Sequence, residues 1–169
     1  MKKGRVWRYG DSVNTDVIFP GKYTYSIQEP KEMAAHALED LDPQFSKKVR
    51  PGDVIVAGSN FGCGSSREQA ATCLKYAGLQ AVIAKSFARI FFRNAINQGL
   101  PVIQSPQAVE NIANGEEIAI DFTRGKIKTK TKSFNFEPLP DYILKILEAG
   151  GLIAYVKKKL KNTNRSRTK

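Results

Sequence analysis

The residues best suited to chemistry lie in one short stretch, residues 58–69, which reads GSNFGCGSSREQ. Gly62 and Gly64 let the backbone turn tightly and come close to a ligand. A helix is expected next, so its free N–H groups and the positive end of its dipole would face the loop. Arg67 adds a planar cation that can bind a carboxylate or phosphate through two hydrogen bonds. The stretch therefore predicts a site for a small anion with serine hydroxyls beside it.

A purely structural interpretation of the same stretch stays open. Ser65 and Glu68 have capping-box spacing, so we expect Ser65 or Ser66 to cap the helix. A tight strand-to-helix turn with an ordinary cap would need the same residue types. The loop does not end in Gly-Lys-Ser/Thr, and it contains neither G-x-S-x-G nor a dinucleotide fingerprint. The residues alone thus support anion binding and no particular reaction.

Alternating strands and helices must position this loop. Apolar runs predict strands at 3–9, 53–58, 80–85 and 100–104, with a possible further strand at 152–156. Helical patterns begin at Pro30 and after the loop, and others cover 87–98, 107–114 and 139–149. Residues 118–130 predict an antiparallel hairpin that turns at Arg124-Gly125. The expected fold is α/β, with a partly parallel central sheet flanked by helices and extra antiparallel β structure at the ends.

The charge of the chain is concentrated at its C-terminal end. The 169 residues are 41% hydrophobic and 25% charged, as expected for one globular domain, and the net charge is +11. Seven of the positive charges and no acid lie in 157–169, which leaves 11 − 7 = +4 for the rest. We therefore predict a folded domain over 1–156 and a basic, disordered tail over 157–169. A tail that binds an acidic partner or RNA is the alternative.

Several classes of protein are disfavoured by composition. No apolar run is long enough to span a bilayer, and no apolar stretch follows the basic N-terminus, so we expect neither a membrane protein nor a secretory signal. Cys63 and Cys73 are too few for a disulfide framework or a four-ligand metal site, and we predict a cytoplasmic location. His36, the only histidine, is expected to be an exposed surface residue.

Three sequence blocks resemble one family. The stretch 58–68 resembles the signature of the small subunit of isopropylmalate isomerase and of the fourth domain of aconitase and homoaconitase. The second block is YGDSVNTDVIFP at 9–20, and the third is KSFARIFFRN at 85–94 followed by NQGLP at 97–101. Their order and spacing match the family over roughly residues 3–156. The resemblance implies a single swivelling β/β/α domain. It also implies the small subunit of a hydro-lyase that interconverts 2- and 3-isopropylmalate by dehydration and rehydration in leucine biosynthesis.

The resemblance also implies roles for individual residues. Ser65 matches the catalytic serine, which takes a proton from the carbon next to a carboxylate and later returns it. Asp16 matches a second catalytic residue, expected to orient an arginine or a substrate hydroxyl, although its side chain could simply form a turn. The residues matched to substrate binding are Thr15, Gly64, Ser66 and Arg67. Gln69 stands where many family members have histidine, and we expect it to lie outside the chemistry.

The reaction that the resemblance implies needs a [4Fe-4S] cluster, and cluster binding needs cysteine thiolates. Two cysteines are too few, so we expect no metal in this chain and a cluster in a separate large subunit. The chain alone should then be inactive. We expect a heterodimer or heterotetramer that acts on a small hydroxy-dicarboxylate.

The resemblance also implies that the loop after the DVIFP segment selects the substrate's side group. Its candidate residues are Lys22, Tyr23, Thr24, Tyr25 and Ile27. Because Lys22 is the only cation among them, the loop favours an apolar isopropyl group over the third carboxylate of homoaconitate or citrate. Alternatives are the small subunit of homoaconitase or of 2,3-dimethylmalate dehydratase, and a stand-alone anion-binding domain. A more remote alternative is a basic module that binds RNA through the tail and through Arg89 and Arg93.

Overall fold

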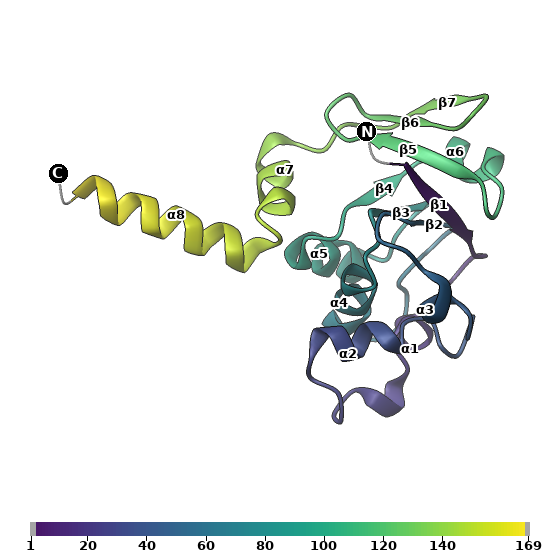
Figure 1. Ribbon diagram of the computed structural model, residues 1–169, viewed down its shortest axis with the longest axis horizontal. Helices are drawn as coiled ribbons and strands as arrows, with labels where there is room; N and C mark the ends of the chain where they lie inside the picture. Colours follow the sequence, from purple (N-terminus) through teal and green to yellow (C-terminus); the bar gives the residue numbers. More distant parts are fainter. Residues whose placement is uncertain (1–2, 168–169) are drawn as a thin grey trace.

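A computed structural model describes residues 3–167, and in the last helix it describes side chains as far as Lys161. The sheet has seven strands in the order β4-β3-β2-β1-β5-β6-β7 (Figure 1). Four strands are parallel: β1 Lys3–Arg8, β2 Val54–Ala57, β3 Ala81–Ala84 and β4 Val102–Gln104. Three strands continue the sheet antiparallel: β5 Glu117–Asp121, β6 Lys126–Lys128 and β7 Ser133–Asn135. The predicted α/β fold with a partly parallel sheet is confirmed.

Helices cover both faces of the parallel strands. The longer helices of the domain body are α4 Glu68–Tyr76, α5 Arg89–Gln98 and α7 Asp141–Glu148. The shorter ones are α1 Thr15–Ile18, the 3-10 helix η1 Gly21–Tyr23, α2 Pro30–Ala35, α3 Phe45–Lys48 and α6 Pro106–Asn111. Every residue of β2 and of β3 is buried, because alternate side chains enter two separate cores. One core contains α4 and α5, and the other contains α6 and the antiparallel strands.

A buried carboxylate joins the start of β2 to β1. Asp53 is 5% exposed and accepts hydrogen bonds from the indole nitrogen of Trp7 at 2.9 Å and from the amides of Arg5 and Arg50. Trp7 in turn packs edge-on against Phe45 of α3, with ring centroids 5.1 Å apart. One acid therefore fixes the register of two strands and the position of the aromatic residues beside them.

The C-terminal region differs from the prediction. Residues 152–156 are not a strand; they begin helix α8, Leu152–Arg167. The same helix continues through 157–167, where a disordered tail was predicted, and residues 168–169 lie outside the described residues. Figure 1 shows α8 extending away from the rest of the domain. The strand and the tail were predicted wrongly because the apolar residues Ile153, Val156 and Leu160 have helical spacing that continues past residue 156, where the domain was predicted to end.

His36 also differs from the prediction. Its side chain is 27% exposed, its ring lies 4.1 Å from the ring of Tyr23, and its Nδ1 contacts the carboxylate of Glu39. His36 is therefore partly buried against Tyr23 and Glu39 and not exposed as expected. Among the described residues, no helix has the length and apolar character needed to cross a bilayer.

We predict that Asp53→Ala lowers the free energy of unfolding by about 3 kcal/mol, since it leaves the indole N–H and two backbone amides without their acceptor. Urea denaturation followed by tryptophan fluorescence measures this change. Glu117→Ala is the control, because its ion pair with Lys3 is exposed and its loss should cost at most about 1 kcal/mol. Equal effects of the two substitutions would contradict the structural role of Asp53.

Candidate functional site

The candidate site lies where the three sequence blocks meet, beyond the carboxyl ends of the parallel strands. The loop after β2 pairs with residues 13–15, since the amide of Gly62 donates to Val13 O at 2.8 Å and that of Thr15 donates to Cys63 O at 2.8 Å. On its other side, the amide of Phe61 donates to Ser86 O at 3.0 Å. Backbone hydrogen bonds from both neighbours therefore hold the glycine-rich loop between the block at 9–20 and the block at 85–94.

Both glycines of the loop are required by its geometry. Gly62 and Gly64 have φ angles of +78° and +91°, which side-chain-bearing residues rarely adopt. A Cβ atom on Gly62 would overlap the ring of Phe91, and one on Gly64 would overlap the amide of Asn14. The expected tight turn is present. Its tightness also depends on Asn14, which sequence reasoning did not single out.

Thr15 lies beneath the loop. It is 2% exposed, and its hydroxyl donates to the carbonyl oxygen of Ser65 at 2.8 Å. Asn14 caps α1 by accepting a hydrogen bond from the amide of Asp16 at 2.8 Å. The first contact holds the Ser65 carbonyl beside Thr15, and the second fixes the start of α1. Direct contact of Thr15 with a substrate stays a prediction.

Asp16 and Arg67 form the charged part of the site. Arg67 Nη2 lies 2.8 Å from Asp16 Oδ1, and Arg67 Nη1 donates to the hydroxyl of Thr24 at 3.1 Å. Among the described residues, Asp16 Oδ1 has no aligned hydrogen-bond donor, so the pair is a close electrostatic contact without hydrogen-bond geometry. Two partners from different segments thus fix the guanidinium. Of the two roles expected for Asp16, this geometry fits the orientation of an arginine.

The predicted serine cap is wrong. The N-cap of α4 is Arg67, with no side-chain cap hydrogen bond, and the Glu68 carboxylate accepts instead from the side-chain amide of Gln98. Ser65 lies too far before the helix to cap it, because Thr15 holds its carbonyl below the loop. Gly64, Ser65 and Ser66 are exposed. The start of α4 is therefore free of a side-chain cap and can bind an anion, beside two serines at an open surface.

The loop expected to select the substrate is fixed from two directions. Gln69 Nε2 lies 3.4 Å from the carbonyl oxygen of Thr24, and Arg67 binds the hydroxyl of the same residue. Lys22 Nζ lies 2.8 Å from Glu39 Oε1 and 3.6 Å from Asp40 Oδ1. Gln69 was expected to lie outside the chemistry, and it proves to contact the loop that borders the site. Only the fold places it next to Thr24.

The aromatic and apolar members of this loop differ in exposure. Tyr25 is 93% exposed, whereas Ile27 is 5% exposed and belongs to the core. Tyr23 is partly buried, and its hydroxyl donates to Glu39 Oε1 at 3.1 Å. The hydrogen bond from Lys22, followed by that of His36, lowers the pKa of Glu39 to about 2. Glu39 is therefore ionised at neutral pH and keeps Lys22 and Tyr23 on one side of the loop.

The two cysteines occupy different environments. Cys63 is partly exposed in the loop, with its Sγ 3.4 Å from Ser12 O, and Cys73 is fully buried on α4. Burial raises the pKa of the Cys73 thiol above its ordinary value. Among the side chains that the structure describes, no group of three or more His, Cys, Asp or Glu could hold a metal ion. The two thiols do not fit the ligand set of an iron–sulfur cluster.

A hollow near the candidate site, at the same edge of the sheet, is lined by two basic side chains that are already paired with other groups. It measures about 530 Å³ and is lined by residues that include Arg8, Asp11, Gly58 and Lys85. Arg8 donates to the carbonyl of Ile112 at 2.7 Å, and Lys85 pairs with Glu110 at 3.0 Å. Both cations are thus engaged in holding α6 against the sheet.

The fold and the site define a class: an α/β domain with a glycine-rich loop, suited to small anions, at the carboxyl ends of its parallel strands. Within that class, the chain belongs to the aconitase C-terminal domain family, whose family model matches residues 12–108. The match spans the loop at 58–69 and the segments that pair with it on both sides.

Curated relatives and a solved structure agree with this assignment. A 3-isopropylmalate dehydratase small subunit from Thermodesulfovibrio yellowstonii is 49% identical over 160 residues, covering 94% of this chain and 95% of the relative. A small subunit of the same name from Archaeoglobus fulgidus is 52% identical and covers 91% of this chain and 96% of its own length. The crystal structure of 3-isopropylmalate dehydratase from Methanocaldococcus jannaschii superposes with a TM-score of 0.90 at 47% identity, covering 97% of this chain and 98% of that one.

We predict that a thiol reagent such as Ellman's reagent modifies one cysteine of the folded protein within minutes and the other only after unfolding. The reason is that Cys63 reaches solvent, whereas Cys73 is buried with a raised pKa. Absorbance during titration, with and without denaturant, counts the thiols. In Cys63→Ala the fast phase should disappear, and its persistence would mean that α4 opens readily.

Proposed function

We propose that this chain is the small subunit of a heteromeric hydro-lyase that interconverts 2-isopropylmalate and 3-isopropylmalate, as its relatives' names indicate. The observation that carries the proposal is the arrangement around Ser65. Its backbone is held by Thr15, it lies ahead of an uncapped helix start, and Arg67, two residues after it, is held by Asp16 and Thr24. This arrangement suits a substrate that carries carboxylates.

Ser65 is the proposed base. As its alkoxide, Ser65 would take the proton from the carbon next to a substrate carboxylate while the substrate hydroxyl leaves. The Ser65 hydroxyl formed in this way would give a proton to the neighbouring carbon when water adds back to the other one. A serine hydroxyl is a weak base, so the alkoxide must be stabilised. The positive end of α4 and the guanidinium of Arg67 supply that stabilisation, since both lie at the end of the same loop.

Arg67, Ser66 and Gly64 are the proposed carboxylate-binding group. Asp16 and Thr24 hold one edge of the guanidinium through its two terminal nitrogens. A cation with fixed orientation loses less conformational entropy when it binds a carboxylate, so binding is stronger and more selective. Asp16 accordingly serves as a positioning residue for Arg67 rather than as a proton carrier.

The loop at residues 22–27, which is expected to contact the substrate's side group, favours an alkylmalate as the substrate. Lys22, the one cation on which a third substrate carboxylate could depend, is bound to Glu39 and Asp40. The exposed ring of Tyr25 offers apolar surface instead. We therefore place 2-isopropylmalate first, 2,3-dimethylmalate second, and homoaconitate after both.

A large subunit completes the proposed enzyme. Gly64, Ser65 and Ser66 lie on open surface, so this chain by itself does not enclose a substrate. The [4Fe-4S] cluster, which in this proposal belongs to the large subunit, would supply the Lewis acid for loss of the substrate hydroxyl. We place the enzyme in the cytoplasm, in keeping with its two free thiols.

The test is turnover by this chain mixed with its cognate large subunit, with the cluster reconstituted without oxygen. We expect an alkylmalate to be turned over, and Ser65→Ala to lower kcat by about 10³-fold or more with subunit binding unchanged. Ser59→Ala is the matched control, because Ser59 lies in the same loop at its strand end. Absence of turnover with isopropylmalate, dimethylmalate, homoaconitate and citrate, in a formed complex with an intact cluster, would refute the proposed function.

We predict that Lys22→Met leaves the ratio of kcat/KM for isopropylmalate over homoaconitate unchanged within about 3-fold, since the ammonium group is engaged with Glu39 and Asp40. Thr24→Val, which removes a partner of Arg67, should instead raise KM for every substrate. Steady-state kinetics with both substrates measures the two effects. A selective loss of homoaconitate turnover in Lys22→Met would show that Lys22 turns toward the substrate.

A further inference from the structure

Helix α8 carries an apolar stripe that nothing in the described part of the chain covers. Ile153, Val156 and Leu160 are 69%, 43% and 60% exposed, and Leu152 beside them is 36% exposed. Their spacing of three and four residues places them along one side of the helix. The stripe therefore forms a continuous exposed apolar surface on an element that extends from the domain (Figure 1).

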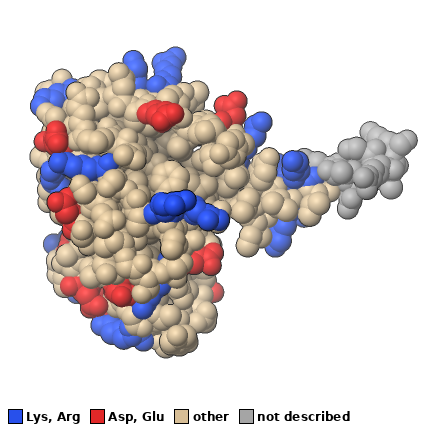
Figure 2. Space-filling model, turned by 180° about the vertical axis from the view of Figure 1, so that it is seen from behind, with Lys and Arg blue, Asp and Glu red and all other residues tan. Residues whose placement is uncertain are grey.

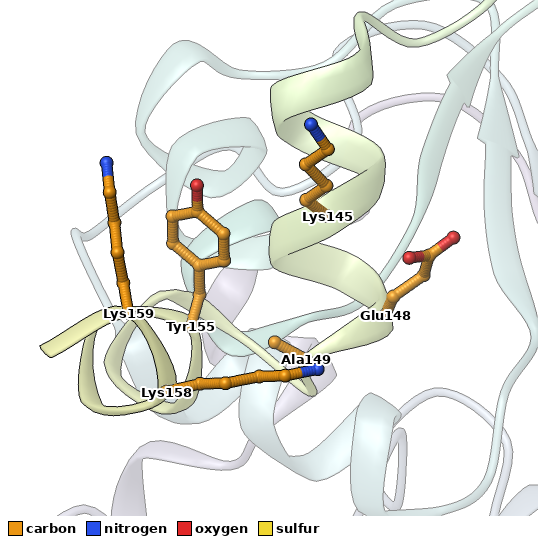
Figure 3. Close-up of a pocket in the computed structure, with 6 residues that line it drawn as sticks. All are labelled: Lys145, Glu148, Ala149, Tyr155, Lys158 and Lys159. Carbon is orange, nitrogen blue, oxygen red and sulfur yellow. The ribbon is translucent and has the colours of Figure 1, made fainter. Parts of the chain in front are cut away.

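A different side of α8 faces the chain's own domain. Tyr155 is partly buried and packs against the core that contains α4 and α5. A hollow of about 260 Å³ separates this side from α7 and is lined by Lys145, Glu148, Ala149, Tyr155, Lys158 and Lys159 (Figure 3). Since the helix already uses the Tyr155 side internally, the stripe is available to another molecule.

The length of α8 also indicates that another molecule covers its apolar stripe. Helices gain most of their stability from burial of an apolar face, and an isolated helix of this length is marginal in water. The part of α8 beyond Tyr155 has Val156 and Leu160 exposed rather than buried. A partner that covered the stripe would supply the missing burial.

Charge identifies the kind of partner. The described side chains of α8 include Lys157, Lys158, Lys159 and Lys161, and the helix contains no acid. Figure 2 shows basic side chains and no acidic side chain on the visible, described part of α8. Pairing of α8 with α8 of a second copy would bring like charges together, and the rest of the chain is itself positive at +4. The favoured partner is an acidic protein surface with an apolar groove.

We propose that α8 is the docking helix for the large subunit, with its apolar stripe in a groove bordered by aspartate and glutamate side chains. This inference rests on the proposed function, and it places an attachment point outside the candidate site. The contact through α8 and the contact around Ser65 then have different effects. The helix sets how tightly the subunits associate, and the loop around Ser65 sets the rate within the complex.

The experiment compares binding of the full chain and of the double variant Ile153→Ala, Leu160→Ala to the cluster-loaded large subunit by titration calorimetry. Alanine keeps helix propensity high, so circular dichroism should show α8 unchanged. We expect the dissociation constant to rise about 30-fold or more. At saturating small subunit kcat should equal that of the wild type, with a matching rise in the concentration that gives half-maximal activity.

Two further variants sharpen the result. Tyr142→Ala removes an apolar side chain of α7 that is 62% exposed, and it should leave the affinity unchanged. Lys157→Glu with Lys161→Glu should slow association and weaken its dependence on salt, because those charges would attract an acidic surface.

Three outcomes would overturn the docking proposal. Unchanged affinity of the Ile153→Ala, Leu160→Ala variant in an active complex removes the helix from the interface and leaves the proposed function intact. Wild-type dimers that this variant converts to monomers would assign the stripe to a second copy. Binding of a homopolymeric RNA that is lost with the two lysine substitutions, without any effect on the large subunit, would assign the helix to nucleic acid. Absence of both wild-type binding and turnover would instead refute the proposed function itself.

Discussion

The backbone pairing between residues 13–15 and 62–63 is the constraint on which the rest of the site depends. It brings a segment that follows β1 against the loop that follows β2, and the amides of Gly62 and Thr15 make its hydrogen bonds. Close approach is possible only because Gly62 and Gly64 have no side chain and adopt positive φ angles. With the two segments held together, Thr15 reaches the carbonyl of Ser65 and Asp16 reaches Arg67. The chemistry proposed for Ser65 thus depends on hydrogen bonds that involve no reactive side chain.

The proposed carboxylate-binding residue Arg67 is also linked to the loop at residues 22–27. Arg67 and Gln69 both contact Thr24, one through the hydroxyl and one through the carbonyl. A substrate that moved the guanidinium would therefore disturb the loop, and a loop that adapted to a side group would shift the guanidinium. On the far side of that loop Glu39, whose low pKa keeps it ionised, holds Lys22 and Tyr23. In the proposed enzyme, recognition of the common carboxylates and recognition of the variable group would therefore be physically coupled through Thr24.

The exposed position of Ser65 fits the proposal that the protein works within a larger assembly. The buried apolar side chains of the described residues form two cores around the parallel strands, and the surface around Ser65 is open. A lone open site would leave the charges of Asp16 and Arg67 in water, where their effect on a reacting group is small. Enclosure by a partner strengthens those interactions without new residues. The exposed stripe on α8 is a second surface with the same need for cover, at a distance along the chain.

The sequence by itself determined where the main strands and helices lie along the chain, the turn at 62–64 and the residues available for chemistry, because hydrophobic period and glycine positions are local properties. It misassigned the cap of α4, the environment of His36 and the structure of 152–167. Each of these is decided by a contact with a residue distant in sequence. Gln98 donates to the Glu68 carboxylate, the ring of Tyr23 lies tilted against that of His36, and Tyr155 packs against the core. The contact of Gln69 with Thr24 likewise could not be predicted from the sequence, since 45 residues separate the two. Only the tertiary structure decides such pairs, because backbone pairing at the strand ends determines which distant side chains come within hydrogen-bonding distance.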